Sequence, residues 1–474
     1  MRQESKLQHI LAQTESVCPH CLKKLPAYKV LCGDEVLLIK RCEIHGEFQT
    51  VVWRGDPAYE SWIRPKIPTQ PKVCYTEIKD GCPFDCGLCA AHRQHTCTAL
   101  LEVTARCNLK CPVCFATSSP LSGPADPGLD IIEGWYKKVI QTSGYCNIQL
   151  SGGEPTVRQD LPEIIEMGRK LGFSFLQLNT NGIRLAEKTS YAAELKRAGL
   201  SSVFLQFDGT EDDIYTSLRG RPLLKEKLSA IKHCAENGIG VVLVPTLVPG
   251  VNVQNIGEII RKACEMSPAV RGVHFQPISY FGRYSHSPVD ESRITLPEVM
   301  QEIEKQTNGM IKAANLRPPG CENALCSFHG NFIKMPGGAL KALSGQHSGA
   351  CCESKTAEKA EEGAKRAVSF VARQWAGPLI NTDRILQGRS KDMKTCVCNK
   401  TKETDEISFD LNEFLDYAKT NSFSVSGMAF QDAWNLDLER LRDCCIHVVA
   451  PDGRLIPFCA YNLTSCAGES LYRK

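Results

Sequence analysis

The sequence predicts an α/β protein whose core is a partial (βα)6 barrel of the TIM type, preceded by an N-terminal β-hairpin unit and followed by a C-terminal α+β domain. The main observation is that strand-like and helix-like segments alternate from residue 147 to about residue 285. Such alternation builds a parallel sheet or barrel, whose strand C-terminal ends carry the chemistry on their loops. The chain of 474 residues is also longer than one typical domain, so further folded units are expected.

Composition excludes several classes of protein. Hydrophobic residues make up 42% and charged residues 23% of the chain, as in a globular protein. The 56 Lys and Arg residues nearly balance the 53 Asp and Glu residues, which argues against a nucleic-acid partner bound through bulk charge. We expect no transmembrane span, because no run of about 18 apolar residues occurs; peripheral contact with a membrane is compatible with the sequence. The first 16 residues lack the apolar segment of a secretion signal, so a cytoplasmic location is predicted.

Cysteine is unusually frequent, with 25 residues, and most of them fall in tight groups. In a chain without a secretion signal, such groups are metal ligands or redox groups more often than disulfides. In the N-terminal unit, residues 1–72, we expect a short polar helix over residues 1–16, a hairpin over residues 27–42 and a Pro-rich linker. A CxxC and a CxxH pair at the hairpin ends predict a tetrahedral site for zinc or a rubredoxin-like iron, formed by Cys18, Cys21, Cys42 and His45. The alternative is a reduced group without metal.

The segment 73–99 holds four cysteines spaced C-x3-C-x2-C-x7-C, namely Cys82, Cys86, Cys89 and Cys97. Thiolates this close together, on a loop bent by Gly and Pro, are able to surround a [4Fe–4S] cluster. We therefore predict an auxiliary cluster here. A second zinc site is the alternative, and Cys74 could replace one ligand.

The predicted barrel, residues 100–310, begins with the strand-like run ALLEVTA and the loop CNLKCPVC. Its cysteines Cys107, Cys111 and Cys114 repeat the C-x3-C-x2-C spacing without a nearby fourth ligand. Three thiolates leave one iron of a [4Fe–4S] cluster open to a substrate or cofactor. Polar residues and glycines then stand where successive predicted strands end: Gly152, Gly153, Glu154, Asn179, Asn181, Asp208 and Gln276.

The motifs CNLKCPVCF, SGGEP and NTNG, in this order, resemble the core of radical S-adenosylmethionine (SAM) enzymes over residues 100 to about 285. The resemblance implies that Cys107, Cys111 and Cys114 hold the catalytic cluster, whose open iron binds SAM. Residues 152–154 would meet the SAM amino group, and the other strand-end residues would contact its ribose, carboxylate or adenine. The implied reaction is reductive cleavage of SAM to a 5′-deoxyadenosyl radical, which abstracts hydrogen from an unactivated C–H bond.

In the C-terminal domain, residues 311–474, we predict a further auxiliary [4Fe–4S] cluster beside the substrate. Its expected ligands come from separated segments that only the fold brings together: Cys321, Cys326, Cys444 and Cys459. The remaining cysteines of this domain receive no assigned role, among them Cys351, Cys352, Cys396, Cys398 and Cys445.

Over nearly the whole chain, the motifs CPHCLKKLPA, GCPFDCGLC, SGGEPTVR and PDGRLIPFCAYN resemble the tetraether lipid synthase branch of radical SAM proteins and the bacterial radical SAM (seleno)protein TrsS family. The lipid branch implies carbon–carbon bond formation on an apolar substrate, held in an apolar tunnel. The implied partners are a small-molecule or lipid-like substrate and a reductant such as ferredoxin or flavodoxin, in an anaerobic or protected cytoplasm.

Other functions stay open at the level of the sequence: modification of a peptide, sulfur or selenium transfer, and electron transfer by an iron–sulfur protein without catalysis. The last explains the cysteines but explains neither SGGEP nor NTNG. RNA binding by the N-terminal unit is disfavoured, because its basic residues are not interleaved with aromatic ones. A long apolar cavity would favour a lipid, and a polar groove near the N-terminal unit would favour a peptide.

Overall fold

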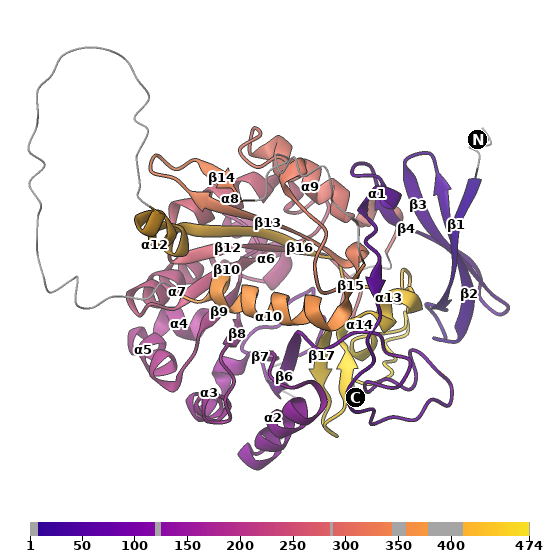
Figure 1. Ribbon diagram of the computed structural model, residues 1–474, viewed down its shortest axis with the longest axis horizontal. Coiled ribbons are helices and arrows are strands. Elements are labelled where there is room, and N and C mark those ends of the chain that lie inside the picture. The colour runs from indigo at the N-terminus through magenta and orange to yellow at the C-terminus, as the bar shows by residue number, and fades with distance from the viewer. Residues whose placement is uncertain (1–7, 119–124, 285–287, 344–356, 378–410, 474) are drawn as a thin grey trace, which may run out of the picture.

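The computed structural model describes residues 8–118, 125–284, 288–343, 357–377 and 411–473. Its main sheet is built on the six barrel strands β6 (Thr98–Thr104), β7 (Asn147–Gly152), β8 (Leu176–Thr180), β9 (Ser202–Gln206), β10 (Gly240–Val244) and β12 (Val270–Pro277). These six strands are parallel and adjacent in this order, which confirms the partial (βα)6 barrel (Figure 1). A short strand, β11 (Thr246–Leu247), pairs with β12.

Two further parallel strands lengthen this arc, and both come from the C-terminal part of the chain. β16 (Ser422–Met428) pairs with β12, and β17 (Ile446–Val449) pairs with β6. Antiparallel strands finish the two edges: β13 (Ser327–Lys334) and β14 (Leu340–Ala342) beside β16, and β18 (Leu455–Pro457) beside β17. The expected domain boundary at residue 310 therefore does not separate two sheets, because strands from both sides of it share one hydrogen-bonded ladder.

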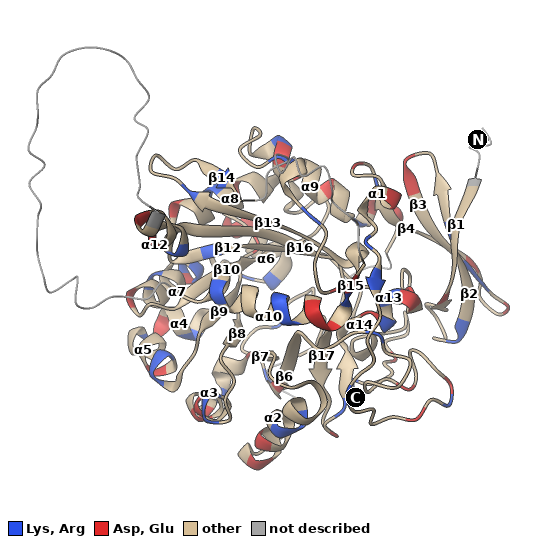
Figure 2. Cartoon of the chain, viewed as in Figure 1, with Lys and Arg blue, Asp and Glu red and all other residues tan. Residues whose placement is uncertain are grey.

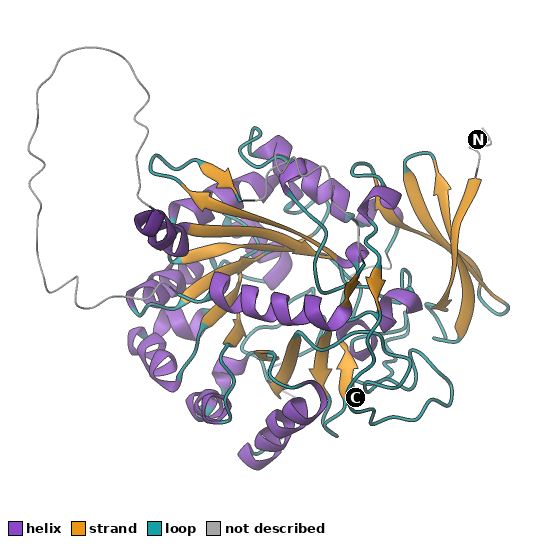
Figure 3. Cartoon of the chain, viewed as in Figure 1, coloured by secondary structure: helices purple, strands orange, loops and turns teal. Residues whose placement is uncertain are grey.

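Helices cover the outer side of the arc (Figure 3). The apolar positions of α8 recur at i, i+3, i+4 and i+7, and Ile256, Ile259, Ile260 and Ala263 are all fully buried. This period is that of a helix face packed on a sheet. The barrel helices are α2 (Leu129–Ser143), α3 (Leu161–Lys170), α4 (Ile183–Glu187), α5 (Thr189–Ala198), α6 (Asp212–Arg219), α7 (Leu224–Glu236), α8 (Ile256–Glu265) and α9 (Leu296–Gln306).

The C-terminal part contributes α10 (Ala360–Trp375), α12 (Leu411–Asn421), α13 (Leu438–Arg442) and α14 (Phe458–Tyr461). Helix α10 packs against β10, β12 and β16. Within the described ranges, no helix combines the length and the hydropathy that crossing a membrane requires. Both acidic and basic residues occur on the outer helices (Figure 2), and α2 and α3 each carry one ion pair between residues four apart.

The N-terminal unit is a separate four-stranded antiparallel sheet of β1 (Gln8–Val17), β2 (Lys24–Cys32), β3 (Glu35–Cys42) and β4 (Gly46–Arg54). The expected polar helix over residues 1–16 is wrong from residue 8 onward, because this segment pairs with β2. Its polar residues are buried against partners far along the chain: Thr14 Oγ1 donates to Asp437 Oδ1 at 2.6 Å, and Lys40 Nζ donates to Ser16 Oγ at 3.0 Å. Tertiary contacts therefore override a pattern that looked like a solvated helix.

Between this unit and the barrel the chain forms α1 (Tyr59–Trp62) and β5 (Lys66–Ile67), which pairs with β15 (Glu358–Lys359). The segment that follows, up to residue 97, contains neither helix nor strand.

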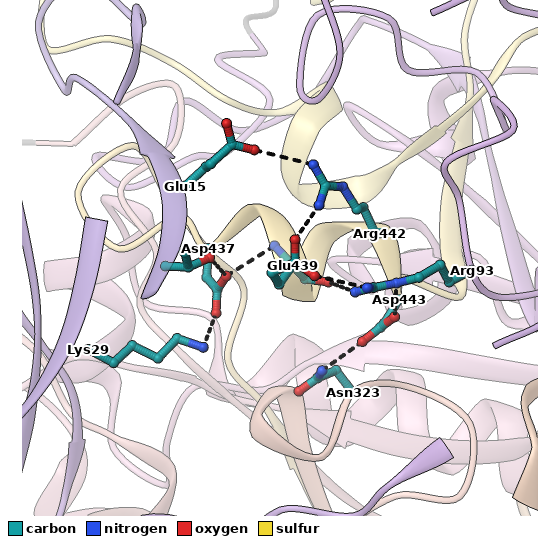
Figure 4. A network of polar contacts seen from close by, with 9 residues as sticks. Glu15, Lys29, Arg93, Asn323, Asp437, Glu439, Arg442 and Asp443 are labelled. Carbon is teal, nitrogen blue, oxygen red and sulfur yellow. Dashed lines mark hydrogen bonds and ion pairs between the residues drawn. The ribbon is translucent and has the colours of Figure 1, made fainter. Parts of the chain in front are cut away.

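We call the N-terminal sheet of β1 to β4 the ribbon. A network of ion pairs joins the ribbon to α13, and joins α13 to this loop segment (Figure 4). Lys29 of β2 pairs with Asp437 at 2.5 Å, and both side chains are largely buried. Arg93 of the loop segment pairs with Glu439 at 2.8 Å and with Asp443 at 2.9 Å. The short helix α13 thus anchors two segments that precede it by more than 300 residues in the sequence.

The final described residues tie further parts together. The Cys86 backbone N–H donates to Tyr472 Oη at 2.9 Å, and Arg473 pairs with Glu102 of β6 at 2.5 Å. The Cys466 backbone N–H donates at 2.9 Å to the carbonyl of Pro19, which lies in the turn between β1 and β2. The tail therefore contacts the ribbon, the cysteine-rich loop and the barrel.

We expect Asp437→Asn to lower the free energy of unfolding by about 3 kcal/mol, because it leaves the largely buried Lys29 ammonium without its counter-charge. Burial alone would raise the pKa of Asp437, but Lys29 and Thr14 lower it below its ordinary value. The stabilisation is therefore complete above the ordinary carboxylate pKa and is lost as the pH falls through the lowered pKa. Urea denaturation, followed by the fluorescence of the buried Trp53 of β4, measures the change.

Glu43→Gln is the matched control, because the Lys23–Glu43 pair at 3.6 Å is largely exposed and is expected to contribute at most about 1 kcal/mol. Equal denaturation midpoints for the two variants would show that the Lys29–Asp437 pair does not hold the ribbon.

Candidate active site

A cavity of about 1210 Å³ lies against the inner face of the parallel arc. One part of its wall is the loop after β6 with the turn after β7, and another part is Cys97 and Cys321 with α10. Ligand pockets usually measure about 300–1,000 Å³. This cavity therefore has room for a cofactor and a second molecule.

The three cysteines of the loop after β6 all line this cavity. Cys107, Cys111 and Cys114 also share one small apolar cluster with Leu109 and Tyr215. Burial raises the pKa of Cys107 to about 12 and also raises that of Cys111. Because thiolates are stable here only with a compensating cation, a three-thiol set at a cavity wall fits an iron–sulfur cluster.

The two glycines of SGGEP bring the turn after β7 against the loop after β6. A Cβ on Gly152 would lie 2.1 Å from the carbonyl oxygen of Thr104, and one on Gly153 would lie 2.2 Å from that of Arg106. The Gly153 N–H donates to Thr104 O at 2.8 Å, and the Glu154 N–H donates to Arg106 O at 2.8 Å. Larger residues would separate the SGGEP turn from the cysteine loop.

Glu154 organises the same region. Its carboxylate accepts from the Thr156 N–H at 3.1 Å and hydroxyl at 2.7 Å, from the Thr180 hydroxyl at 2.6 Å and from the Asn181 N–H at 2.7 Å. The Asn181 side chain in turn donates to Asn108 Oδ1 at 2.7 Å. These hydrogen bonds join the ends of β7 and β8 to the cysteine loop, and Glu154 also lines the cavity.

Asp208 is fully buried and is not among the residues that line the cavity. It holds Arg219 through two contacts of 2.7 Å, and it is Arg219 that reaches the cavity wall and the Val113 carbonyl. Burial alone would lower the pKa of Arg219, but the Asp208 carboxylate raises it above its ordinary value. Asp208 therefore positions Arg219 at the cavity wall, and its direct contact with the cofactor stays a prediction.

Other residues near the predicted SAM site differ in whether they reach the cavity. Asn179 and Gln276 line the cavity. Arg158, which follows the SGGEP turn, bonds to Asp160 and to the Val103 and Pro127 carbonyls.

Sequence reasoning identified Asn179 and Gln276 but missed the polar layer to which they belong, on the inner face of the strands. Asn147, Gln149 and Ser151 alternate with buried apolar residues along β7, and similar residues continue the layer on other strands. Parallel strands covered on both faces usually read as continuous apolar runs. The alternation was therefore a signal that one face of the arc borders a cavity. The cavity residues of this layer on the other strands are Gln177, Asn179, Gln206, His274, Gln276, Ser327, His329, Asn331, Ser424 and Ser426.

The N-terminal site forms as the spacing indicates. The ligand atoms of Cys18, Cys21, Cys42 and His45 all lie within 4.8 Å of one another. The His45 Nδ1 atom is 3.4 Å from the Cys18 sulfur and 3.5 Å from the Cys42 sulfur. Four ligands at this spacing suit a tetrahedral structural ion.

The fold regroups the remaining cysteines. Cys97 does not stay with the loop thiols of Cys82, Cys86 and Cys89, because it immediately precedes β6 beside β17, where its N–H donates to Cys445 O at 2.8 Å. Cys97, Cys321 and Cys445 have sulfur atoms within 4.8 Å of one another, and Cys97 and Cys321 are joined as a disulfide.

Cys321 accordingly leaves its expected set as well. Burial raises the pKa of Cys444 and that of Cys459, and the nearby Cys326 thiol raises both further. Of the vicinal pair, Cys445 belongs to the group with Cys97 and Cys321, whereas Cys444 does not. Cys351, Cys352, Cys396 and Cys398 lie outside the described residues.

Comparison with known proteins identifies the class. Residues 101–263 match the radical SAM superfamily, and residues 10–54 match the zinc ribbon described as the HMPTM N-terminal zinc ribbon domain. The protein is therefore a radical SAM enzyme: the class uses SAM and a [4Fe–4S] cluster, and the other cysteine groups fit auxiliary clusters and a zinc ion. This excludes an iron–sulfur protein without catalysis.

A 7,8-dihydro-6-hydroxymethylpterin dimethyltransferase of Methanocaldococcus jannaschii is 34% identical over 487 residues, which cover 95% of this chain and 93% of the relative. The chain belongs to the family of this relative within the radical SAM superfamily. The finer assignment to the tetraether lipid synthase branch or the TrsS family stays a prediction.

Solved structures show a partial likeness. Streptococcus suis SuiB bound to its precursor peptide SuiA aligns with a TM-score of 0.39 and 15% identity, over 46% of this chain and 47% of SuiB. The anSMEcpe protein with bound AdoMet aligns with a TM-score of 0.35 and 20% identity, over 44% of this chain and 59% of that chain. The chain thus spans about half the length of these solved structures.

We expect Glu154→Gln to weaken SAM binding about tenfold and to lower stability by about 1–3 kcal/mol, because the amide NH2 cannot accept the hydrogen bonds that the carboxylate receives. Equilibrium dialysis with SAM and thermal denaturation measure the two effects. Glu163→Gln, on the exposed face of α3, is the control. Unchanged SAM affinity in Glu154→Gln would show that the SGGEP turn is not part of the cofactor site.

Proposed function

We propose that this enzyme uses SAM to abstract hydrogen from a C–H bond of a substrate held in the cavity, and that the reaction forms a carbon–carbon bond. The observation that carries the proposal is one continuous cavity, whose wall includes both the three cysteines after β6 and the polar layer of the strands. When bound, the cluster and SAM supply one-electron reductive cleavage, with 5′-deoxyadenosine as the product of hydrogen abstraction. A one-electron reductant such as ferredoxin or flavodoxin would supply the electron.

In this proposal Cys107, Cys111 and Cys114 ligate the cluster, and the Glu154 network holds the strand ends that bind SAM. Arg219 brings a fixed positive charge to the cavity wall near Cys111. Its orientation is set by Asp208, so it suits a carboxylate or another anionic group. The apolar cluster around the cysteines limits the access of water to the reacting atoms.

A flat, hydrogen-bonding heterocycle such as a reduced pterin is the substrate class that the cavity favours. The side-chain oxygens of Asn147, Asn179 and Asn331 are buried without a hydrogen-bond partner, and all three residues line the cavity. Buried acceptors without a partner cost free energy unless a ligand donates to them. The amino and ring N–H groups of a pterin are suitable donors, and the relative named above acts on a pterin.

An apolar chain is the second candidate, because aromatic residues form another part of the same wall. Phe281 and Phe458 line the cavity in edge contact, and Phe204 and Trp375 pack together beside His274. Carbon–carbon bond formation on a lipid tail would use this surface.

We expect cluster-loaded, reduced protein to form 5′-deoxyadenosine from SAM under anaerobic conditions, and Cys111→Ala to fall to background, because the cluster loses a ligand. Chromatography of the quenched reaction measures the product. Cys234→Ala, which removes a buried thiol of α7, should retain activity. Equal product from Cys111→Ala would contradict the assignment of the catalytic cluster.

Adding 7,8-dihydro-6-hydroxymethylpterin or a long-chain glycerol lipid to this assay separates the two substrate classes. Faster product formation with the pterin supports the heterocycle. Stimulation by the lipid alone would overturn the heterocycle in favour of the apolar chain.

We expect Asn147→Leu and Asn331→Leu to raise the KM for the pterin about tenfold, since each removes an acceptor worth about 1.4 kcal/mol. The thermal midpoint should not fall, because the replacement also removes an unpartnered buried oxygen. The exposed Gln254→Leu serves as the control. A lower midpoint together with an unchanged KM would show a purely structural role.

A further inference from the structure

We infer that Cys97, Cys321 and Cys445 form a second metal site in the wall of the cavity, which binds a single thiophilic divalent ion and leaves one coordination position open to the substrate. Only the open position rests on the proposed function. The metal site itself is argued from the geometry of the three thiols.

The three sulfur atoms meet because two parallel strands begin side by side. Cys97 immediately precedes β6 and Cys445 immediately precedes β17, and these strands pair in the register Thr98↔Ile446. Cys321 is brought to them by its loop, whose carbonyl accepts from Gln94 Nε2 at 2.5 Å and from Lys66 Nζ at 2.5 Å. All three cysteines are at least nine-tenths buried.

One ion requires less movement of the three thiols than a cubane does. Sulfurs bound to one tetrahedral zinc ion, at about 2.3 Å each, lie about 3.8 Å apart; here two sulfurs are bonded to each other and all three lie within 4.8 Å. A [4Fe–4S] cluster places its thiolates on different irons and keeps them farther apart. The Cα atoms of Cys97 and Cys321 are 7.4 Å apart, more than the about 4.4–6.8 Å usual for a disulfide.

The disulfide and the metal are alternative states of the same thiols. Two thiols of a dithiol reductant supply two electrons and two protons, which reduce the Cys97–Cys321 bond to two thiols and leave the reductant as a disulfide. The ion then displaces three protons to solvent as the three thiols become thiolates. The nearby Lys66 ammonium offsets part of the negative charge of three thiolates around a divalent ion.

The open position faces the cavity. Cys97, Cys321 and Cys445 all line it, and so do Gly320 and Glu322 of the same loop. The Glu322 carboxylate lies 4.0 Å from the Cys445 sulfur but is not within 4.8 Å of all three sulfurs. Its other oxygen accepts from the Ser327 hydroxyl at 2.6 Å. The protein thus supplies three ligands, and a donor atom of a substrate is able to supply the fourth.

The site lies well away from the catalytic cysteines. β6 separates Cys97 from the loop that begins after Thr104, and its seven residues span about 20 Å at 3.3 Å per residue. A substrate coordinated to the ion would therefore be held by one end while its other end points toward the SAM site. The ion acts as an anchor that fixes which carbon is presented.

The first test is metal and sulfide analysis of the full-length protein, purified anaerobically in the presence of a dithiol reductant. Cys445→Ala should lose one equivalent of divalent metal without loss of acid-labile sulfide. Cys444→Ala, one residue away and outside the group of three sulfurs, should keep that equivalent, and so should Cys234→Ala. Circular dichroism confirms that each variant is folded.

Two results would overturn the single-ion site. Loss of about four irons and four sulfides in Cys445→Ala would indicate a cluster. The other result is a metal content that does not change in Cys445→Ala, while Cys97 and Cys321 resist alkylation in the wild-type protein. This result would indicate a permanent disulfide.

The second test examines the open position after exchange of the site with Co²⁺, using imidazole as a small donor. A shift of the visible cobalt bands on adding imidazole to the wild-type protein supports an open position. The opposite result is no band shift with imidazole, together with cobalt bands that are already altered in Glu322→Gln. This result would assign the fourth position to Glu322 and overturn the proposal of an open position. Neither readout depends on SAM cleavage, so a failure of the proposed reaction would be seen separately in the 5′-deoxyadenosine assay.

Discussion

The parallel pairing of β6 is the constraint on which the rest of the molecule depends. β6 bonds to β7 on one side and to β17 on the other, in registers that leave little freedom at either end. At its beginning the pairing sets Cys97 beside Cys445. At its end the loop of Cys107 meets the SGGEP turn of β7, because glycine allows the two backbones to touch. One strand therefore aligns the catalytic loop with the second thiol group.

Buried charges hold this arrangement at three places, and two of these ion pairs join parts of the chain that are distant in sequence. Arg219–Asp208 sits beneath the cavity wall, Lys29–Asp437 joins the ribbon to α13, and Arg293–Asp432 joins the end of the barrel to the C-terminal segment at 3.0 Å. Taking such charges out of water is costly, so their value lies less in net stability than in orientation. A guanidinium held by two carboxylate oxygens has one orientation, so the groups that it contacts are also held in place.

Local patterns were sufficient to predict the barrel, because strands and helices of this length can be recognised from the periodic spacing of their apolar residues. The apolar positions of α8 and the glycines after β7 needed no tertiary information. The N-terminal Cys/His site also followed from local spacing, but the group of Cys97, Cys321 and Cys445 needed tertiary information. Cys97 lies only eight residues after Cys89, yet the pairing with β17 carries it to Cys445, and nothing local distinguishes these two outcomes. The same limit applies to residues 8–16, whose polar side chains looked solvated until Asp437 and Lys40 supplied partners from outside the segment. The polar layer of β7 was visible as an alternation, but its meaning depended on the cavity beside it.

The contacts of the tail also order events in time. A ribosome releases the ribbon and the barrel strands β6 to β12 well before β17, α13 and the residues around Tyr472. Until those residues emerge, Cys97 has no β17 to pair with and the cysteine-rich loop lacks the hydrogen bond that Tyr472 provides. Contacts separated by more than 300 residues are slow to form because loop closure must precede them. We therefore expect the tail to dock last, and metal delivery to the thiols of the barrel and of the loop to precede that docking.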